Sequence, residues 1–165
     1  MTDREALKTL LSEFGAAMGL PDLTLDENNC CSILAGEDTV IHLQYREAAG
    51  DFLFVGPVGV LPEKDEDQSD VLKFLLISNL YGTDTDGGTL SLEPNGNIVL
   101  LHRVWDPKGA DSARLVHALV AFGELLTLWQ KRYADMLSED DDGASPFEET
   151  APEVPSVPVD PTLMA

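Results

Sequence analysis

Residues 51–58, with the sequence DFLFVGPV, restrict the fold more than any other stretch of this chain. Side chains of an extended strand alternate between two faces, so Phe52 and Phe54 share one face while Leu53 and Val55 share the other. A strand in a sheet with one solvated face would alternate with polar residues instead. The stretch therefore predicts a sheet strand that needs cover on both sides.

Four further strands are predicted by apolar runs that are bounded by turn residues. They are residues 30–34 (CCSIL), 39–45 (TVIHLQY), 89–92 (TLSL) and 97–105 (NIVLLHRVW). The short connections at 35–38 and 48–50 favour a meander of the first three strands. Residues 94–97 (PNGN) are a good turn between the last two strands, because Asn-Gly tolerates a positive φ.

Three helices are predicted by apolar residues at three- and four-residue spacing. Their spans are residues 2–18, 71–81 and 111–137. The order is helix, three strands, helix, two strands, helix. This order predicts the α+β class, with an antiparallel twisted sheet packed against helices.

The charge of the chain excludes one class of partner. The sequence has 30 Asp and Glu against 10 Lys and Arg, for a formal net charge of −20. Nucleic-acid binding needs cations that replace the counterions of the phosphates, so this charge argues strongly against it. An anionic membrane surface is disfavoured for the same reason. A high net charge also keeps a protein soluble when it exposes apolar surface.

Two further features of the sequence concern the compartment. The N-terminus is charged and is followed by no signal-like apolar run, and no apolar run approaches the roughly 20 residues that span a bilayer. Cys30 and Cys31 are neighbours, so a disulfide between them is sterically awkward and free thiols are expected. We therefore expect a cytoplasmic protein with no membrane insertion.

The last segment, residues 138–165, differs in composition from the rest. It has eight acidic residues, no basic residue and five prolines. Such a segment cannot bury enough apolar surface to offset the entropy of ordering. The sequence thus predicts a folded domain over residues 1–137 and an acidic, Pro-rich disordered tail over residues 138–165.

Residues 82–93 imitate a calcium-binding loop. Asp84, Asp86 and Glu93 stand at the third, fifth and twelfth positions of the motif. Gly82 occupies the first position, which requires a carboxylate, and a strand follows where the motif needs a helix. The stretch is therefore interpreted as a helix-to-strand connection, and a calcium-binding or hydrolytic protein is kept only as a third hypothesis.

Other candidate catalytic residues lack partners in the sequence. His42, His102 and His117 are isolated, and no spacing brings a carboxylate or thiol to them. Cys30 and Cys31 are more typical of a small buried pair than of a nucleophile. No phosphate loop, nucleophile elbow or dinucleotide fingerprint is present. The sequence predicts no enzyme, no metal and no cofactor.

The predicted elements offer more apolar faces than one small sheet can cover. One interpretation is that all of these faces pack inside a single core. The other is that some faces remain for partners, because large exposed apolar patches usually mark binding sites. Residues 98–104 are apolar on both faces, and this strand or the helix at 71–81 could form a self-complementary twofold interface.

The layout, together with LLISNLYG (75–82), GGTLSLEPNGNIVLLHRV (87–104) and a last helix with aromatic residues, resembles the class I chaperones of type III secretion. These are small acidic, Tir-chaperone-like proteins that escort individual effectors. The resemblance covers about residues 3–137. The residues that fit the family pattern are Asn79, Leu80, Leu90, Leu92, Pro94, Gly96, Leu100, Leu101, Phe122 and Trp129.

The resemblance implies a homodimer that uses no ATP and catalyses no reaction. It implies that the dimer binds the N-terminal chaperone-binding region of a secreted virulence effector in apolar grooves built by the first helix and the first sheet. The groove candidates are Leu7, Leu10, Leu11, Phe14, Ile41, Leu43, Phe52 and Phe54. The dimer candidates are Leu72, Leu76, Leu80, Val99 and Leu101.

Within the same resemblance, an alternative is a regulatory or adaptor protein that binds a folded partner or a secretion component, with the secretion ATPase as a further partner. Each groove or dimer candidate is equally compatible with a place in the core. The tail extends past the last helix of the family. The hypothesis for the tail is that it solubilises the free chain or competes weakly for the groove.

Overall fold

The computed structural model describes residues 3–20, 23–35, 39–93, 95 and 97–139. The predicted order of helices and strands is confirmed, and one short 3₁₀ turn, η1, is added. The elements are α1 (Asp3–Met18), β1 (Cys30–Ala35), β2 (Thr39–Arg46), β3 (Asp51–Val60), α2 (Asp65–Ser78), η1 (Leu80–Gly82), β4 (Thr89–Glu93), β5 (Ile98–Trp105) and α3 (Ser112–Glu139). Of the predicted tail, residues 138–165, positions 138 and 139 belong to the end of α3 and residues 140–165 lie outside the described residues. Pro94 and Gly96 of the turn and residues 36–38 of the 35–38 connection also lie outside them.

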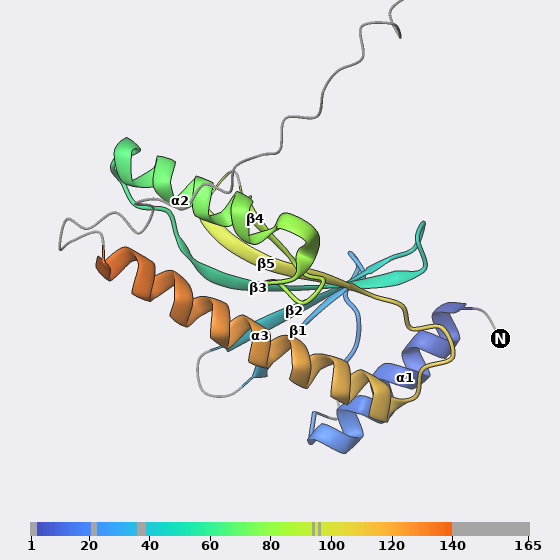
Figure 1. Ribbon diagram of the computed structural model, residues 1–165. Helices are drawn as coiled ribbons and strands as arrows, with labels where there is room; N and C mark the ends of the chain where they lie inside the picture. The colour runs from blue at the N-terminus through green and yellow to red at the C-terminus, as the bar shows by residue number, and fades with distance from the viewer. Residues whose placement is uncertain (1–2, 21–22, 36–38, 94, 96, 140–165) are drawn as a thin grey trace, which may run out of the picture.

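The strands form one antiparallel sheet in the order β1-β2-β3-β5-β4. The first three strands are the predicted meander, and β4 and β5 are the predicted antiparallel pair. Figure 1 shows α3 running along one side of the sheet, with α1 lying across the N-terminal end of α3. The helix α2 lies beside β4. The fold is α+β, as the sequence predicts.

The second predicted helix differs from the structure at both ends. It begins at Asp65 rather than at residue 71, because the acidic residues before Val71 form its first turn, where the helix dipole favours negative charge. It ends at Ser78, and residues 80–82 continue as η1. Tyr81 has a φ of 60° inside this turn, which a non-glycine residue rarely adopts.

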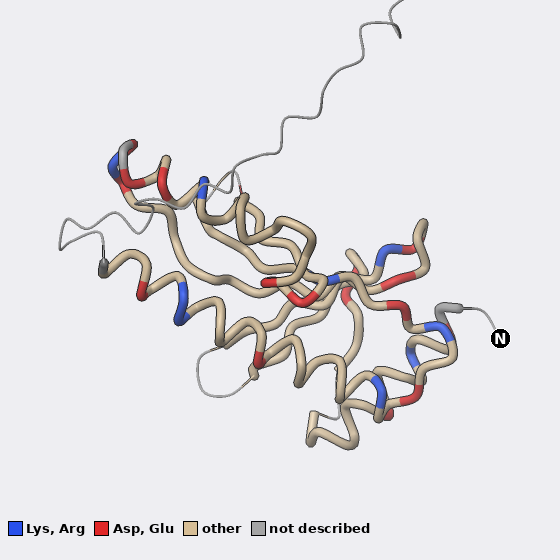
Figure 2. The backbone as a smooth tube through the Cα atoms, in the orientation of Figure 1, with Lys and Arg blue, Asp and Glu red and all other residues tan. Residues whose placement is uncertain are grey.

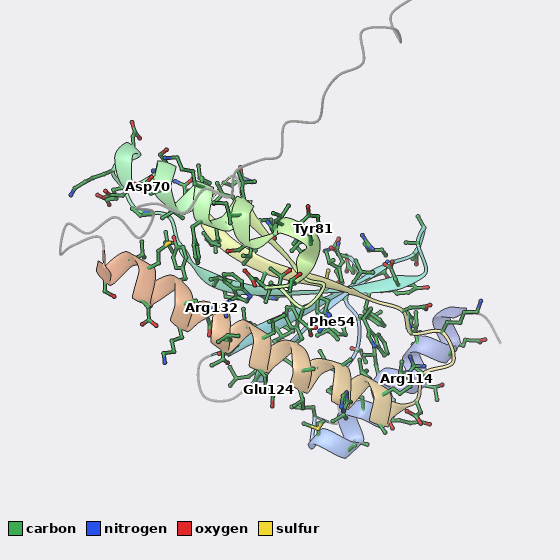
Figure 3. All side chains as sticks on the ribbon, in the orientation of Figure 1. Phe54, Asp70, Tyr81, Arg114, Glu124 and Arg132 are labelled. Carbon is green, nitrogen blue, oxygen red and sulfur yellow. The ribbon has the colours of Figure 1, made fainter. Side chains whose placement is uncertain are left out.

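The core lies between the sheet and the helices α1, α2 and α3. Its centre is an aromatic cluster in which the Phe54 ring lies 5.8 Å from the Trp105 ring and 5.8 Å from the Phe122 ring, measured between centroids. Phe54 points from the sheet toward α3 (Figure 3). The face of β3 that carries Phe52 and Phe54 is thus the covered face, and the predicted cover on both faces is absent among the described elements.

Two glycines of β3 bring α3 close to the sheet. A Cβ atom at Gly59 would lie 2.5 Å from the Tyr133 ring, and one at Gly56 would overlap the Leu126 side chain. The β3–β5 register shifts between Pro57 and Gly59. This irregularity turns Gly56 and Gly59, three residues apart, toward the same helix.

Side chains of α3 also bond the backbone of β3 at this irregularity. The Gln130 amide donates to the carbonyl of Pro57 at 2.9 Å, and the Tyr133 hydroxyl donates to the carbonyl of Val60 at 2.9 Å. Both bonds satisfy carbonyl groups that the disturbed ladder leaves available. Burial raises the pKa of the Tyr133 hydroxyl, so it remains a donor at neutral pH.

The outer edge of β4 is capped by one side chain. The Asn79 amide nitrogen donates to the carbonyl of Leu90 at 2.9 Å, and the N–H of Leu90 donates to the Asn79 amide oxygen at 2.8 Å. Asn79 therefore pairs with both backbone groups of Leu90, as a neighbouring strand would. This contact also fixes the end of α2 against the sheet.

By length and composition alone, residues 112–138 would also pass for a membrane-spanning helix. From the sequence, no membrane-spanning run is predicted. In this fold the apolar stripe of α3 packs on the sheet and is fully buried at Leu115, Phe122 and Leu126. The remaining face of α3 carries exposed charged residues such as Glu124 and Lys131. This is the pattern of a core helix.

Gly59→Ala should lower the free energy of unfolding by about 1–3 kcal/mol, because its methyl group would overlap a rigid ring that is held by a hydrogen bond. Urea denaturation followed by circular dichroism measures the change. Gly123→Ala in α3 is the matched control, since its Cβ would meet Ile41 at an ordinary 3.6 Å. At position 123 the better helix propensity of alanine should raise the free energy of unfolding by roughly 0.5–1 kcal/mol. Equal effects at both positions would contradict the close approach of α3.

Asn79→Asp should lower the free energy of unfolding by about 1–3 kcal/mol at pH 7, because an ionised carboxylate cannot donate to the Leu90 carbonyl. The protonated carboxyl can donate, so folding raises the pKa of this introduced group. A raised pKa means that the folded state gains stability as pH falls, and the deficit relative to the wild type should shrink from pH 7 toward pH 4. A deficit that is constant with pH in urea titrations would contradict the proposed bond.

Candidate functional site

Residues 82–93, which imitate a calcium-binding loop, form a connection that is held by a hydrogen bond within it. Thr85 is fully buried, and its hydroxyl donates to the carbonyl of Gly88 at 2.7 Å. The carboxylate of Asp86 pairs with the guanidinium of Arg103 at 3.0 Å. In the described part of the chain, no group of three or more His, Cys, Asp or Glu residues lies close enough to hold a metal ion.

The two thiols are poorly suited to nucleophilic chemistry. Burial, followed by the proximity of Cys30 and Asp26, raises the pKa of Cys31 to about 11. Burial and then Asp26 also raise the pKa of Cys30. The thiolate is the reactive form of cysteine, so both thiols stay protonated at neutral pH.

The strand histidines do not converge on a catalytic group. His42 lies 2.7 Å from the Ser32 hydroxyl, measured from Nδ1, and it faces away from the core. Burial, followed by Arg46, lowers the pKa of His102. In the pairing of β2, β3 and β5, Val55 separates the two histidines. The arrangement therefore offers no acid–base pair.

The structure places all eight groove candidates inside the protomer. Leu7 and Leu10 are 4% and 7% exposed, and Leu11, Phe14, Ile41, Leu43, Phe52 and Phe54 are at most 2% exposed. In this protomer they are core residues, because the four on α1 and the four on β2 and β3 lie on the facing sides of the helix and the sheet. Their contact with a partner stays a prediction.

Leu7 and Leu10 also line a cavity, which we call the α1 cleft. It has a volume of about 850 Å³ and lies between α1, the β2–β3 turn and the loop from β5 to α3. Its lining residues are Ala6, Leu7, Leu10, Tyr45, Ala49, Gly50, Asp51, Val104, Asp106, Pro107, Lys108, Gly109 and Ala110. The cleft is the feature that brings together residues from the first helix and the first sheet.

The α1 cleft has apolar walls and charged groups among its lining. Leu7, Leu10 and Tyr45 are buried and supply apolar surface. Asp51 is held by Arg46 through two hydrogen bonds of 2.7 and 2.8 Å. Such a cleft can accept apolar side chains of a peptide between polar groups, and it contains no nucleophile with a neighbouring base.

The dimer candidates separate into two sets. Leu72, Leu76 and Leu80 are 39%, 73% and 59% exposed, whereas Val99 and Leu101 are completely buried. In the protomer Val99 and Leu101 are core residues, because they lie on the buried face of β5, and their place in a dimer contact stays a prediction. The strand β5 has apolar residues on both faces, so its local pattern does not indicate which face α3 covers.

Two further exposed apolar residues lie beside Leu80, within the predicted helix at 71–81 but outside the five dimer candidates. Ile77 is 56% exposed and Tyr81 is 92% exposed. Ile77 follows Leu76 directly, so it falls outside a simple three- and four-residue stripe. The left-handed backbone of Tyr81 has no sequence signal apart from the Gly82 that follows. Leu72, Leu76, Ile77, Leu80 and Tyr81 are called the α2 patch below.

The two edges of the sheet differ. Asn79 occupies the β4 edge at Leu90, whereas no strand among the described residues pairs with the outer edge of β1. An unpaired edge can accept an extended chain through its backbone groups.

Comparison with known proteins places this arrangement in a known group. A family model described as the Tir chaperone protein (CesT) family matches residues 9–130. A Chlamydia pneumoniae protein is 28% identical over 120 residues, which cover 72% of this chain and 91% of that protein.

Solved structures share the fold at low identity. The ExsC–ExsE complex gives a TM-score of 0.67 at 21% identity, with 79% of this chain and 96% of that chain covered. A Yersinia pestis complex of the type III secretion chaperone SycH with a fragment of YscM2 gives 0.55 at 17% identity, with 74% and 98% covered. The HopA1–SchA chaperone–effector complex gives a TM-score of 0.58 at 20% identity, with 76% and 93% covered.

The family match spans the whole sheet, all of α2 and the larger part of α1 and α3, and it agrees with the resemblance of the sequence to class I secretion chaperones. The family is one of chaperones rather than enzymes. The chain belongs to the Tir chaperone protein (CesT) family of type III secretion chaperones.

Proposed function

We propose that this protein is a cytoplasmic bacterial chaperone that binds the N-terminal chaperone-binding region of a secreted effector. It keeps that effector soluble and competent for secretion and presents it to the secretion machinery without ATP. The observation that carries this proposal is the α1 cleft, where Leu7, Leu10 and Tyr45 provide apolar walls beside the sheet.

The physical requirements of this role agree with the cleft. Holding a disordered segment buries on the order of 1,000–3,000 Å² and costs roughly 2–5 kcal/mol in ordering. A long partner segment therefore needs several shallow apolar contacts in addition to any one pocket. The strong negative charge of the chain would keep the chaperone soluble while those surfaces are open.

We also propose that the protein is a homodimer through the α2 patch. Leu72, Leu76 and Leu80 recur every four residues, which forms a ridge that can pack against its own copy. Burial of the five side chains would remove on the order of 600 Å² per subunit, near the lower limit of a stable interface. Tyr81 adds the largest exposed aromatic surface to the patch.

A second candidate function is an adaptor or regulator of the same fold that binds a folded partner, a secretion component or the secretion ATPase. An adaptor would leave its partner's N-terminal segment as sensitive to protease as in the free partner. An escort would protect that segment. Limited proteolysis of the purified complex therefore separates the two functions.

Leu76→Asp should convert the dimer to a monomer, because it places a charge in the centre of an apolar self-contact. Sedimentation velocity at micromolar concentration measures the mass. Val120→Asp is the matched control, since Val120 is 52% exposed on α3 and lies outside the α2 patch. A wild-type protein that sediments as a monomer, or a Leu76→Asp variant that stays dimeric, would rule out this interface.

Ala6→Trp should weaken effector binding by roughly tenfold or more, because an indole at this exposed position would fill part of the α1 cleft. Ala17→Trp is the control on the exposed side of the same helix, away from the cleft. The measurement is retention of the co-expressed effector on tagged chaperone, followed by limited proteolysis. Equal retention by both variants would exclude the cleft from effector binding.

A further inference from the structure

The tail, residues 138–165, contains a proline repeat that the proposed function does not use. Four prolines recur at every third residue of the sequence PEVPSVPVDP: Pro152, Pro155, Pro158 and Pro161. A polyproline II helix has three residues per turn, so prolines at this spacing align along one ridge. Val154 and Val157 share a second ridge for the same reason. Residues 152–161 are called the proline segment below.

The charge of the tail stands mainly before the proline segment. Six of the eight acidic residues of the tail fall between positions 139 and 149, whereas the proline segment carries only Glu153 and Asp160. The tail is therefore an acidic stretch followed by a more apolar one. A proline-rich sequence binds grooves with apolar walls at a low cost in entropy, because it is already extended before it binds.

The α1 cleft has walls of the kind that such a segment needs. Leu7, Leu10 and Tyr45 are buried side chains of its lining, and Pro107 lies among them. Proline ridges typically dock against aromatic rings in a groove. The outer edge of β1 is a poorer site for them, because proline has no N–H group to donate to a strand.

The length of α3 sets the distance between the tail and the cleft. The cleft is lined by residues 106–110, just before the first turn of α3, whereas the tail follows the last turn. The 28 residues of α3 cover about 40 Å. An extended chain covers that distance with roughly 13 residues. Counted from Glu139, this brings the start of the proline segment to the α1 cleft.

The charges of the helices favour a path along α3. This helix has three Lys and Arg against three Asp and Glu, whereas α2 has four Asp and Glu against one Lys. Figure 2 shows charged residues of both signs spaced along α3 and several acidic residues at the start of α2. The acidic stretch 139–149 would be repelled by α2. Lys131 and Arg132, which are exposed near the end of α3, would attract it.

We propose that the proline segment binds in the α1 cleft of its own chain as a polyproline II helix, with the acidic stretch 139–149 along α3. Because the segment is tethered, its effective concentration at the cleft is on the order of a millimolar, so a weak contact suffices. The contact shields the apolar walls of the cleft in the free protein. The tail then competes with an effector for the cleft, a consequence that rests on the proposed function.

The test is photo-crosslinking of the purified full-length protein without an effector. A photoreactive benzoylphenylalanine replaces Lys108, an exposed residue of the cleft lining, and in a control it replaces Lys73, an exposed residue of α2 outside that lining. Mass spectrometry of a digest identifies the joined peptides. The expected result is an adduct within one chain between position 108 and the proline segment, and no such adduct from position 73.

Val157→Asp should lower the yield of the adduct at position 108 by roughly tenfold, because it places an unpaired charge against apolar walls. Thr150→Asp is the matched control, since it adds the same charge before the proline segment and should leave the yield unchanged. Both positions follow the end of α3, so neither substitution alters a described helix or strand. Equal yields from the two variants would overturn the inference.

The remaining outcomes separate this inference from the proposed function. An adduct that joins two copies of the chain, or no adduct between position 108 and the proline segment, would overturn the contact within one chain. Retention of a co-expressed effector then decides the proposed function by itself. An adduct within one chain that is lost when the effector is bound supports both proposals. The same adduct in a protein that retains no effector supports the contact and counts against the proposed function.

Discussion

The close approach of α3 to β3 is the contact on which the rest of the structure depends. Gly56 and Gly59 leave room for Leu126 and Tyr133, and two side-chain hydrogen bonds from α3 join the irregular part of β3. The helix is thereby fixed along the middle strand of the sheet, so its apolar stripe covers the face that carries Phe52 and Phe54. The position of α3 therefore decides which surfaces of the sheet stay uncovered.

Covering one face of the sheet with α3 decides what remains for partners. The described helices cover the sheet face that carries Phe52 and Phe54, and Asn79 occupies the β4 edge at Leu90. The opposite face of the sheet, the β1 edge and the α2 patch stay open among the described residues. These open surfaces differ in kind: a sheet face of mixed side chains, a strand edge with backbone groups, and an apolar helical ridge. The proposed dimer contact and the proposed effector contact need different kinds of surface, because permanent and transient interfaces differ in polarity.

The absence of enzymatic chemistry has a physical basis in the described residues. The thiols have raised pKa values, the strand histidines are separated by Val55, and Asp86 is paired with Arg103. The thiols stay protonated at neutral pH, and the printed contact of His42 is with the Ser32 hydroxyl on the face of β2 that points away from the core. The chemistry of the molecule is therefore that of surfaces, which agrees with its membership in a chaperone family.

The sequence by itself determined the order of elements, the α+β class and the family, because hydrophobic periodicity and turn residues are local signals. It also pointed to Leu76 and Leu80 of the α2 patch. Only the tertiary structure decided that Val99 and Leu101 are buried in the protomer, and that the eight groove candidates on α1, β2 and β3 are buried there too. A strand with two apolar faces does not encode which face a helix will cover. That choice depends on the fit between Gly59 and Tyr133, which are far apart in the sequence.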